Sequence, residues 1–118
     1  MSVLLLAIGG VAGVLARYGI SRATLHSDAL IWSTVAINVV GSFFLGLLVG
    51  TTWLSRDLRD AVGIGFLGGF TTFSTFSVQI VLDVDGGEPW RALAYLMASV
   101  VGGVAAAACG YVLGRKLA

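Results

Sequence analysis

Hydroxyl and phenylalanine side chains are concentrated in one apolar stretch, residues 65–77, which reads GFLGGFTTFSTFS. The hydroxyl groups can donate hydrogen bonds, and the edge of a phenylalanine ring carries partial positive charge. Phe73 and Phe76 are three residues apart, so they point the same way on a helix. Two ring edges, together with hydroxyl and amide hydrogens, can replace the water around a small anion. The stretch therefore predicts an anion site, with simple packing of the two rings as the alternative.

The glycine pair Gly68–Gly69 comes directly before these hydroxyl groups and predicts a break in a helix. Hydrocarbon tolerates irregular backbone only where protein buries it or where it lines a cavity. A broken helix has free N–H groups at one half-helix end, which suit an anion, and free carbonyls at the other, which suit a cation. We expect residues 68–72 to be unwound.

Neutral hydrogen-bonding side chains recur on the neighbouring apolar stretches. Asn38 has Thr34 one turn before it and Ser42 one turn after it, and Tyr95 and Ser99 are also one turn apart. Residues four apart share a helix face, so each set can form a polar track. Interhelical hydrogen bonding is the alternative role. We prefer it for Ser42, whereas for Asn38 the two roles are balanced.

The charged residues supply few groups for chemistry. Arg17 ends a long apolar run, and its guanidinium either extends to the membrane interface or supplies positive potential at an anion vestibule. His26 is expected in a solvated loop and Cys109 in apolar packing. The carboxylates are expected in loops or at the ends of apolar stretches: Asp28, Asp57, Asp60, Asp83, Asp85 and Glu88. Acid–base and nucleophilic catalysis lack their groups, so the chain is not expected to be an enzyme.

The composition predicts an all-α integral membrane protein. Hydrophobic residues make up 58% of the 118 residues and charged residues 11%, against about 25% charged in soluble domains. We predict a single four-helix domain, residues 1–118, whose third helix is broken mid-membrane. The expected spans are about 3–20, 30–53, 58–82 and 90–113.

Small residues at helical spacing predict close helix packing. They form the pairs Gly9/Gly13, Gly46/Gly50 and Gly65/Gly69, and the ladder Gly102, Ala106, Gly110 and Gly114. Basic residues are nearly balanced between the two sides: Arg56, Arg59, Arg115 and Lys116 against Arg17, Arg22 and Arg91. Such a weak bias is compatible with insertion in both orientations and favours an antiparallel homodimer. A parallel dimer would have a stronger bias.

Taken together, these residues resemble the CrcB/Fluc family of fluoride channels. The matching pieces are GGVAGVLARYG (9–19), TVAINVVGSFFLG (34–46), the highly specific GFLGGFTTFSTFS (65–77), and the pair Tyr95/Ser99. The resemblance implies a dual-topology homodimer of four-helix subunits in the cell membrane. It also implies two antiparallel fluoride pathways and a structural sodium ion at the dimer interface.

Site residues follow from the resemblance by position. The backbone carbonyls of Gly68 and Thr71 match those that hold the sodium ion. Gly103 departs from the pattern, because some relatives carry a further serine there. The fluoride-pathway positions, from the ring pair through the asparagine and the polar track to the vestibule arginine, are Phe73, Phe76, Asn38, Thr34, Ser99, Thr75, Tyr95 and Arg17.

The function implied is passive export of fluoride from the cytoplasm, which lowers cellular fluoride and gives fluoride resistance. A small dual-topology transporter of cationic or hydrophobic compounds is the alternative. The expected absence of a carboxylate within the membrane argues against it. A purely structural membrane subunit is a third possibility, but it would leave Asn38 and the hydroxyl-rich run without a purpose.

Overall fold

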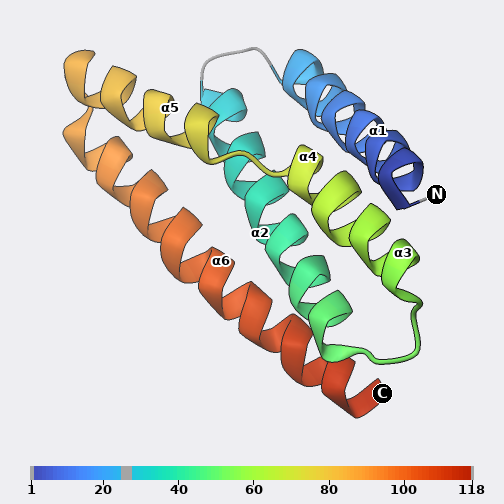
Figure 1. The fold of residues 1–118 in the computed structure, drawn as a ribbon. Coiled ribbons are helices and arrows are strands. Elements are labelled where there is room, and N and C mark those ends of the chain that lie inside the picture. The colour runs from blue at the N-terminus through green and yellow to red at the C-terminus, as the bar shows by residue number, and fades with distance from the viewer. Residues whose placement is uncertain (1, 25–27, 118) are drawn as a thin grey trace.

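The computed structural model describes residues 2–24 and 28–117, with the side chains of residues 28–30 left aside; His26 lies outside these ranges. The described chain is helical, as predicted, and its segments run up and down past one another (Figure 1). The helices are α1 (Ser2–Ala23), α2 (Asp28–Gly50), α3 (Arg56–Asp60), the wider π-helix η1 (Ala61–Leu67), α4 (Gly68–Phe70), α5 (Phe73–Asp85) and α6 (Pro89–Leu117).

Within the described residues, four segments are long and apolar enough to cross a membrane, which confirms the predicted number of spans. They are Ser2–Ala23, Ile31–Gly50, Arg56–Asp85 and Pro89–Leu117. The second helix ends three residues earlier than expected, at Gly50. Arg59 accounts for this end, because its guanidinium donates to the carbonyls of Leu48 and Thr51 at 2.9 and 2.7 Å. These carbonyls are therefore satisfied without a further helical turn.

The small-residue stripes bring helix backbones into direct contact, as predicted. Gly13 of α1 lies against the Phe66 carbonyl, and a Cβ added at Gly69 would come within 2.7 Å of the Gly10 carbonyl oxygen. Between α2 and α6, a Cβ at Gly110 would collide with the Phe43 carbonyl. Two tightly packed pairs result: α1 with residues 56–70, and α2 with α6.

The third segment is interrupted at Thr71 and Thr72, not at the glycine pair. Residues 56–70 are helical throughout, and Gly68 and Gly69 belong to α4. Thr71 and Thr72 are extended, with ψ of 158° and 122°. The expectation of unwound glycines was wrong because Gly69 is needed for close helical contact with α1. The threonines suit the interruption, since the Thr72 hydroxyl caps α5 by accepting from the Thr75 N–H at 3.2 Å.

Beyond the interruption, α5 leaves the line of α4 and lies beside α6 (Figure 1). A small core of Ile31, Phe76 and Tyr95 joins α5 and α6 to α2. Asp83 was expected at a span end, but it lies within α5, where it is only 5% exposed. Its charge is matched by Arg91 of α6, with the closest nitrogen and oxygen 2.7 Å apart.

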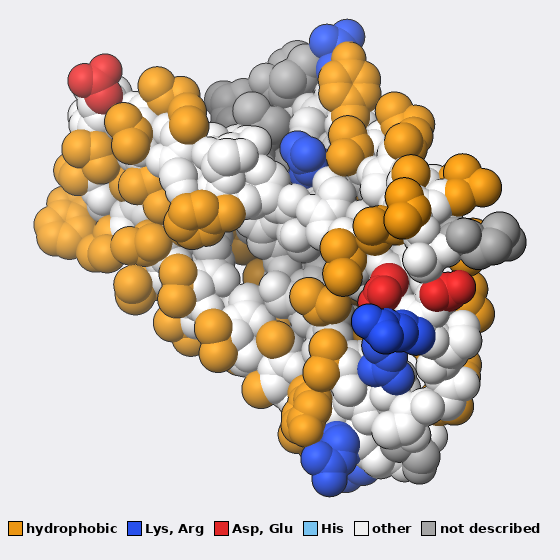
Figure 2. Space-filling view, in the orientation of Figure 1, with side chains coloured by type: hydrophobic (Ala, Val, Ile, Leu, Met, Phe, Trp, Pro, Cys, Tyr) orange, Lys and Arg blue, Asp and Glu red, His pale blue; other side chains and the backbone are white. Residues whose placement is uncertain are grey.

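Hydrophobic side chains cover much of the outside of the molecule, with charged side chains in small groups among them (Figure 2). Lipid or another protein chain must cover such a surface. Cys109, expected in packing, is exposed here. It lies outside the face of α6 that carries Gly103, Gly110 and Gly114 toward α2. The chain is a multi-pass membrane protein.

Candidate functional site at the helix interruption

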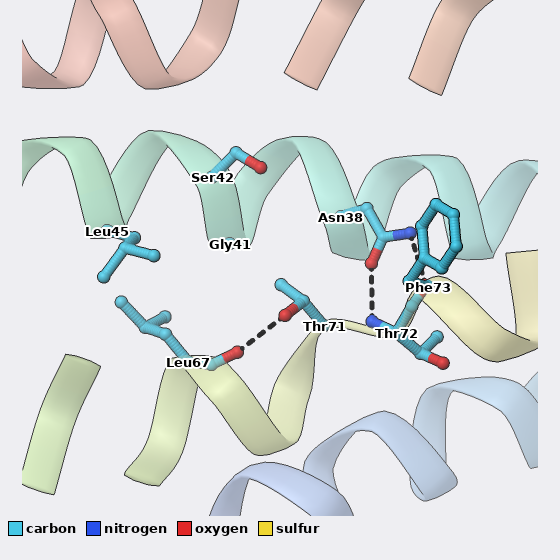
Figure 3. A pocket seen from close by; sticks show the side chains of 8 residues that line it. All are labelled: Asn38, Gly41, Ser42, Leu45, Leu67, Thr71, Thr72 and Phe73. Carbon is cyan, nitrogen blue, oxygen red and sulfur yellow. Dashed lines mark hydrogen bonds between the residues drawn. The ribbon is translucent and has the colours of Figure 1, made fainter. Parts of the chain in front are cut away.

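Asn38 of α2 holds the interruption through both ends of its side-chain amide. Its Oδ1 accepts from the Thr72 N–H at 2.8 Å, and its Nδ2 donates to the Thr72 carbonyl at 2.9 Å. The two bonds are visible in Figure 3 as dashed lines between α2 and the extended residues. Asn38 therefore takes the place of the helical partners that Thr72 has lost. One hydrogen of the Asn38 amide group is still available for a ligand.

Arg17 of α1 approaches the interruption from the other side. Its Nε donates to the Gly69 carbonyl at 3.1 Å, and the side chain is half-buried. In a continuous helix, that carbonyl would accept from the N–H of Phe73. Arg17 therefore points toward the end of α4.

The carbonyls of Gly68 and Thr71 also lose their usual helical donors. The Thr72 N–H, which would bond the Gly68 carbonyl in a continuous helix, donates to Asn38. The Thr75 N–H, which would bond the Thr71 carbonyl, donates to the Thr72 hydroxyl. Gly68 is exposed and Thr71 half-exposed in the single chain. Both oxygens are thus free of these donors and close to the protein surface.

Cavities lie on both sides of the extended residues, and Thr72 lines both. The first, of about 220 Å³, is bordered by α2, the end of η1, the extended residues and the start of α5, and it is drawn in Figure 3. Its polar lining is Asn38, Ser42, Thr71 and Thr72. The second, of about 340 Å³, lies among α1, α2 and α5. Its polar lining is Arg17, Tyr18, Ser21, Thr34, Thr72, Thr75 and Gln79.

The phenylalanine pair has two different environments. The ring centroids of Phe73 and Phe76 are 5.7 Å apart, so the rings are neighbours as predicted. Phe73 is 78% exposed, whereas Phe76 is 5% exposed. The Phe76 ring packs edge to face on the Tyr95 ring, with the ring centroids 5.1 Å apart. Only Phe73 lines one of the two cavities. Within one chain, the two rings do not enclose a common site.

Two hydroxyl groups of α6, those of Tyr95 and Ser99, are buried. Tyr95 is fully buried and donates to the side-chain oxygen of Gln79, and Thr34 lies within hydrogen-bonding range of the same hydroxyl. The Ser99 hydroxyl oxygen is buried and has no hydrogen-bond partner among the described residues. Tyr95 and Ser99 line neither of the two cavities.

The structure thus groups the predicted residues in three places. Arg17, Thr34 and Thr75 border one cavity, Asn38, Thr71 and Phe73 border the other, and Phe76, Tyr95 and Ser99 lie in or near the core. Gln79 was not among the residues predicted from the sequence. Its signal was its place four residues after Thr75 and four before Asp83, which puts all three on one helix face.

A family model described as "CrcB-like protein, Camphor Resistance (CrcB)" matches residues 4–111. The chain belongs to the CrcB family. The fluoride-specific ion channel FluC of Sphingopyxis alaskensis is 40% identical over 116 residues, which are 93% of this chain and 92% of the relative. That of Geobacter sulfurreducens is 41% identical over 105 residues, 84% and 85% of the two chains. That of Thermus thermophilus is 40% identical over 119 residues, 97% and 95%. Membership of the CrcB family also agrees with a multi-pass protein of the cell membrane.

Proposed function

We propose that this chain is the subunit of a fluoride-selective channel that lets fluoride leave the cytoplasm down its electrochemical gradient. Membership of the CrcB family and the relatives that are fluoride-specific ion channels support this function. The observation that carries it is the interruption at Thr71 and Thr72, with a cavity on each side. Hydroxyl, amide and guanidinium donors line these cavities, and they suit a small anion that has lost its water.

The charges near the cavities favour a channel over the alternative transporter. Neither cavity is lined by a described carboxylate that could carry a coupling proton. Asp83, the carboxylate buried within α5, is held in an ion pair by Arg91. A buried acid in such a pair is poorly suited to bind and release a proton or a cationic substrate. Its chemistry is that of a fixed link between two helices.

The interruption would lie near the middle of the membrane, since Thr71 and Thr72 are central in the span Arg56–Asp85. The working form would be an antiparallel homodimer. In support, Phe73 is exposed on the single chain, and α5 packs on few neighbours there. A second copy in the opposite orientation would cover Phe73 and complete two pathways.

A structural sodium ion would lie at the centre of this dimer, bound by the carbonyls of Gly68 and Thr71 of both subunits. These oxygens fit a hard monovalent cation because they carry no full charge and are free of their usual helical donors. In support, Gly68 is exposed on the single chain. The ion would supply a fixed positive charge between the two pathways.

Fluoride efflux from liposomes that contain only this protein tests the function. A fluoride electrode should record rapid efflux when a potassium ionophore balances the charge, and no efflux from protein-free liposomes. Chloride-loaded liposomes provide the selectivity control and should release little chloride. A protein that is folded but moves no fluoride would contradict the proposed function. Efflux that requires an imposed proton gradient would indicate an exchanger.

A further inference from the structure

One face of α1 combines close backbone contact with a positively charged end. Gly13 and Arg17 are four residues apart and therefore share that face. Gly13 allows α1 to approach the Phe66 carbonyl, and one turn further on the Arg17 Nε lies 3.1 Å from the Gly69 oxygen. The contact at Gly13 thus fixes the position of α1 along residues 56–70, so that the Arg17 guanidinium lies at the carboxyl-terminal end of α4.

The end of α4 carries partial negative charge. Residues 56–70 form one helical segment, and the last carbonyls of a helix have no helical donors. Two bonds from Thr71, through its N–H and its hydroxyl, satisfy the Leu67 carbonyl at 3.0 Å each. Among the described residues, Arg17 is the donor to the Gly69 carbonyl.

The same arginine borders the larger cavity, together with Thr34 and Thr75. Without a cation on Gly69, the carbonyl end of α4 would present negative potential close to this cavity. That potential would repel an anion at the place where the hydroxyl donors could bind it. A guanidinium fixed on the carbonyl reverses the sign of the potential, and a full charge outweighs the half charge of a helix end.

We propose that Arg17 is a positioning residue that replaces the lost helical N–H at Gly69 and neutralises the carbonyl end of α4 beside the anion cavity. The electrostatic role, which is to neutralise the carbonyl end of α4 beside an anion, rests on the proposed function. The positioning role, which is to hold the Gly69 carbonyl, rests on the hydrogen bond alone. A charge that merely raised the vestibule potential would need no fixed partner, so the two roles can be separated by experiment.

The test compares Arg17→Met with Arg22→Met in the full-length protein. Arg22 is the matched control, because it is an exposed arginine on the same helix and neutralising it removes the same charge. Hydrogen–deuterium exchange is measured on peptides that cover residues 68–75. Loss of the bond to Gly69 should speed exchange there by about tenfold in Arg17→Met. Arg22→Met should exchange at the wild-type rate.

Fluoride efflux from liposomes is the second measurement. Arg17→Met should lose several times more flux than Arg22→Met, and Arg17→Lys should restore slow exchange and part of the flux because its ammonium can donate to Gly69. Wild-type exchange in Arg17→Met would overturn the positioning role. Equal flux loss in the two Met variants would overturn the electrostatic role. If Arg17→Met does not fold, Arg17→Lys is expected to fold, because its ammonium can still donate to the Gly69 carbonyl. Failure of Arg17→Lys to fold would overturn the proposal.

If the wild-type protein moves no fluoride, the electrostatic role of Arg17 beside an anion cavity is wrong. The exchange result would still decide whether Arg17 holds the interruption. The failure of the proposed function and the failure of this inference therefore give different results.

Discussion

Asn38 and Thr72 exchange two hydrogen bonds, one from the Thr72 N–H to the asparagine Oδ1 and one from the asparagine Nδ2 to the Thr72 carbonyl. The pairing joins α2 to the extended residues between α4 and α5. An amide side chain can do this because it carries a donor and an acceptor side by side, as a backbone peptide does. Asn38 is therefore a structural partner of the interruption as well as a possible ligand of an anion.

The first prediction concerns the stability that this pairing supplies. Asn38→Ala removes the two hydrogen bonds to Thr72 and leaves the Thr72 carbonyl without its donor, which should lower the free energy of unfolding by about 1–3 kcal/mol. Ser42→Ala is the control, since Ser42 lies one turn away, lines the same cavity and makes no hydrogen bond with the described residues. Unfolding in detergent measures both variants. Equal stability of the two would contradict the role of Asn38.

The second prediction separates the two phenylalanine rings. Phe73→Ile changes an exposed ring and should leave the stability of the single chain unchanged, whereas Phe76→Ile changes a buried ring that packs on Tyr95 and should lower it. If ring edges bind fluoride, flux should fall by about tenfold or more in both variants. Phe44→Ile, a half-exposed ring on α2, is the control. Unchanged flux in both test variants would show that the two rings serve packing and do not bind fluoride.

The fold was largely predictable because its signals are local. Four apolar segments and glycines four residues apart specify helices that pack backbone to backbone, and the structure contains both. The exact place of the interruption was not predictable in this way. Glycine freedom pointed to Gly68 and Gly69, but tight contact with α1 keeps Gly69 helical, and the Asn38 side chain competes for the backbone of Thr72.

The site was predictable in its residue types and less so in its contacts. Thr34, Asn38 and Thr75, which border the cavities, were identified from type and spacing, whereas Tyr18, Ser21 and Gln79 were not. The hydrogen bond from Arg17 to Gly69 joins residues 52 positions apart in the sequence, and no local sequence pattern predicts a contact between such distant residues. The exposure of Phe73 was likewise not predictable, because no local pattern shows which side of α5 the rest of the chain covers.

The third prediction concerns the buried pair of Tyr95 and Gln79. Tyr95→Phe removes the hydroxyl that donates to Gln79 and should lower the free energy of unfolding by about 1–3 kcal/mol, because a buried acceptor loses its donor. Adding Gln79→Leu should recover part of this loss, since the unsatisfied group is then gone. A double-mutant cycle measures the coupling. Strictly additive losses would show that the two side chains act independently.

The fourth prediction concerns orientation. The near balance of basic residues should insert the chain in both directions, so tags on either terminus should be accessible from both faces of the membrane. Adding arginines at the exposed positions Thr52 and Leu117 should drive one orientation and abolish flux. Co-expression with an oppositely biased variant should restore it. A wild-type chain found in a single orientation would rule out the antiparallel homodimer.

The last prediction concerns the sodium ion. Four neutral carbonyls, from Gly68 and Thr71 of two subunits, would bind it with moderate strength, and only while the interruption keeps Thr72 and Thr75 from donating to them. The ion should be structural, so fluoride flux should persist without a sodium gradient and weaken when sodium is removed exhaustively.

Asn38→Ala provides the internal control for this ion. That variant frees the Thr72 N–H to return to the Gly68 carbonyl, so its remaining flux should depend less on sodium than wild-type flux does. Liposomes prepared with sodium or with a large organic cation measure both proteins. Flux that scales with an imposed sodium gradient would instead identify a coupled transporter. The proposal of a structural sodium ion would then be wrong, because an ion that crosses the membrane with fluoride cannot also hold two subunits together.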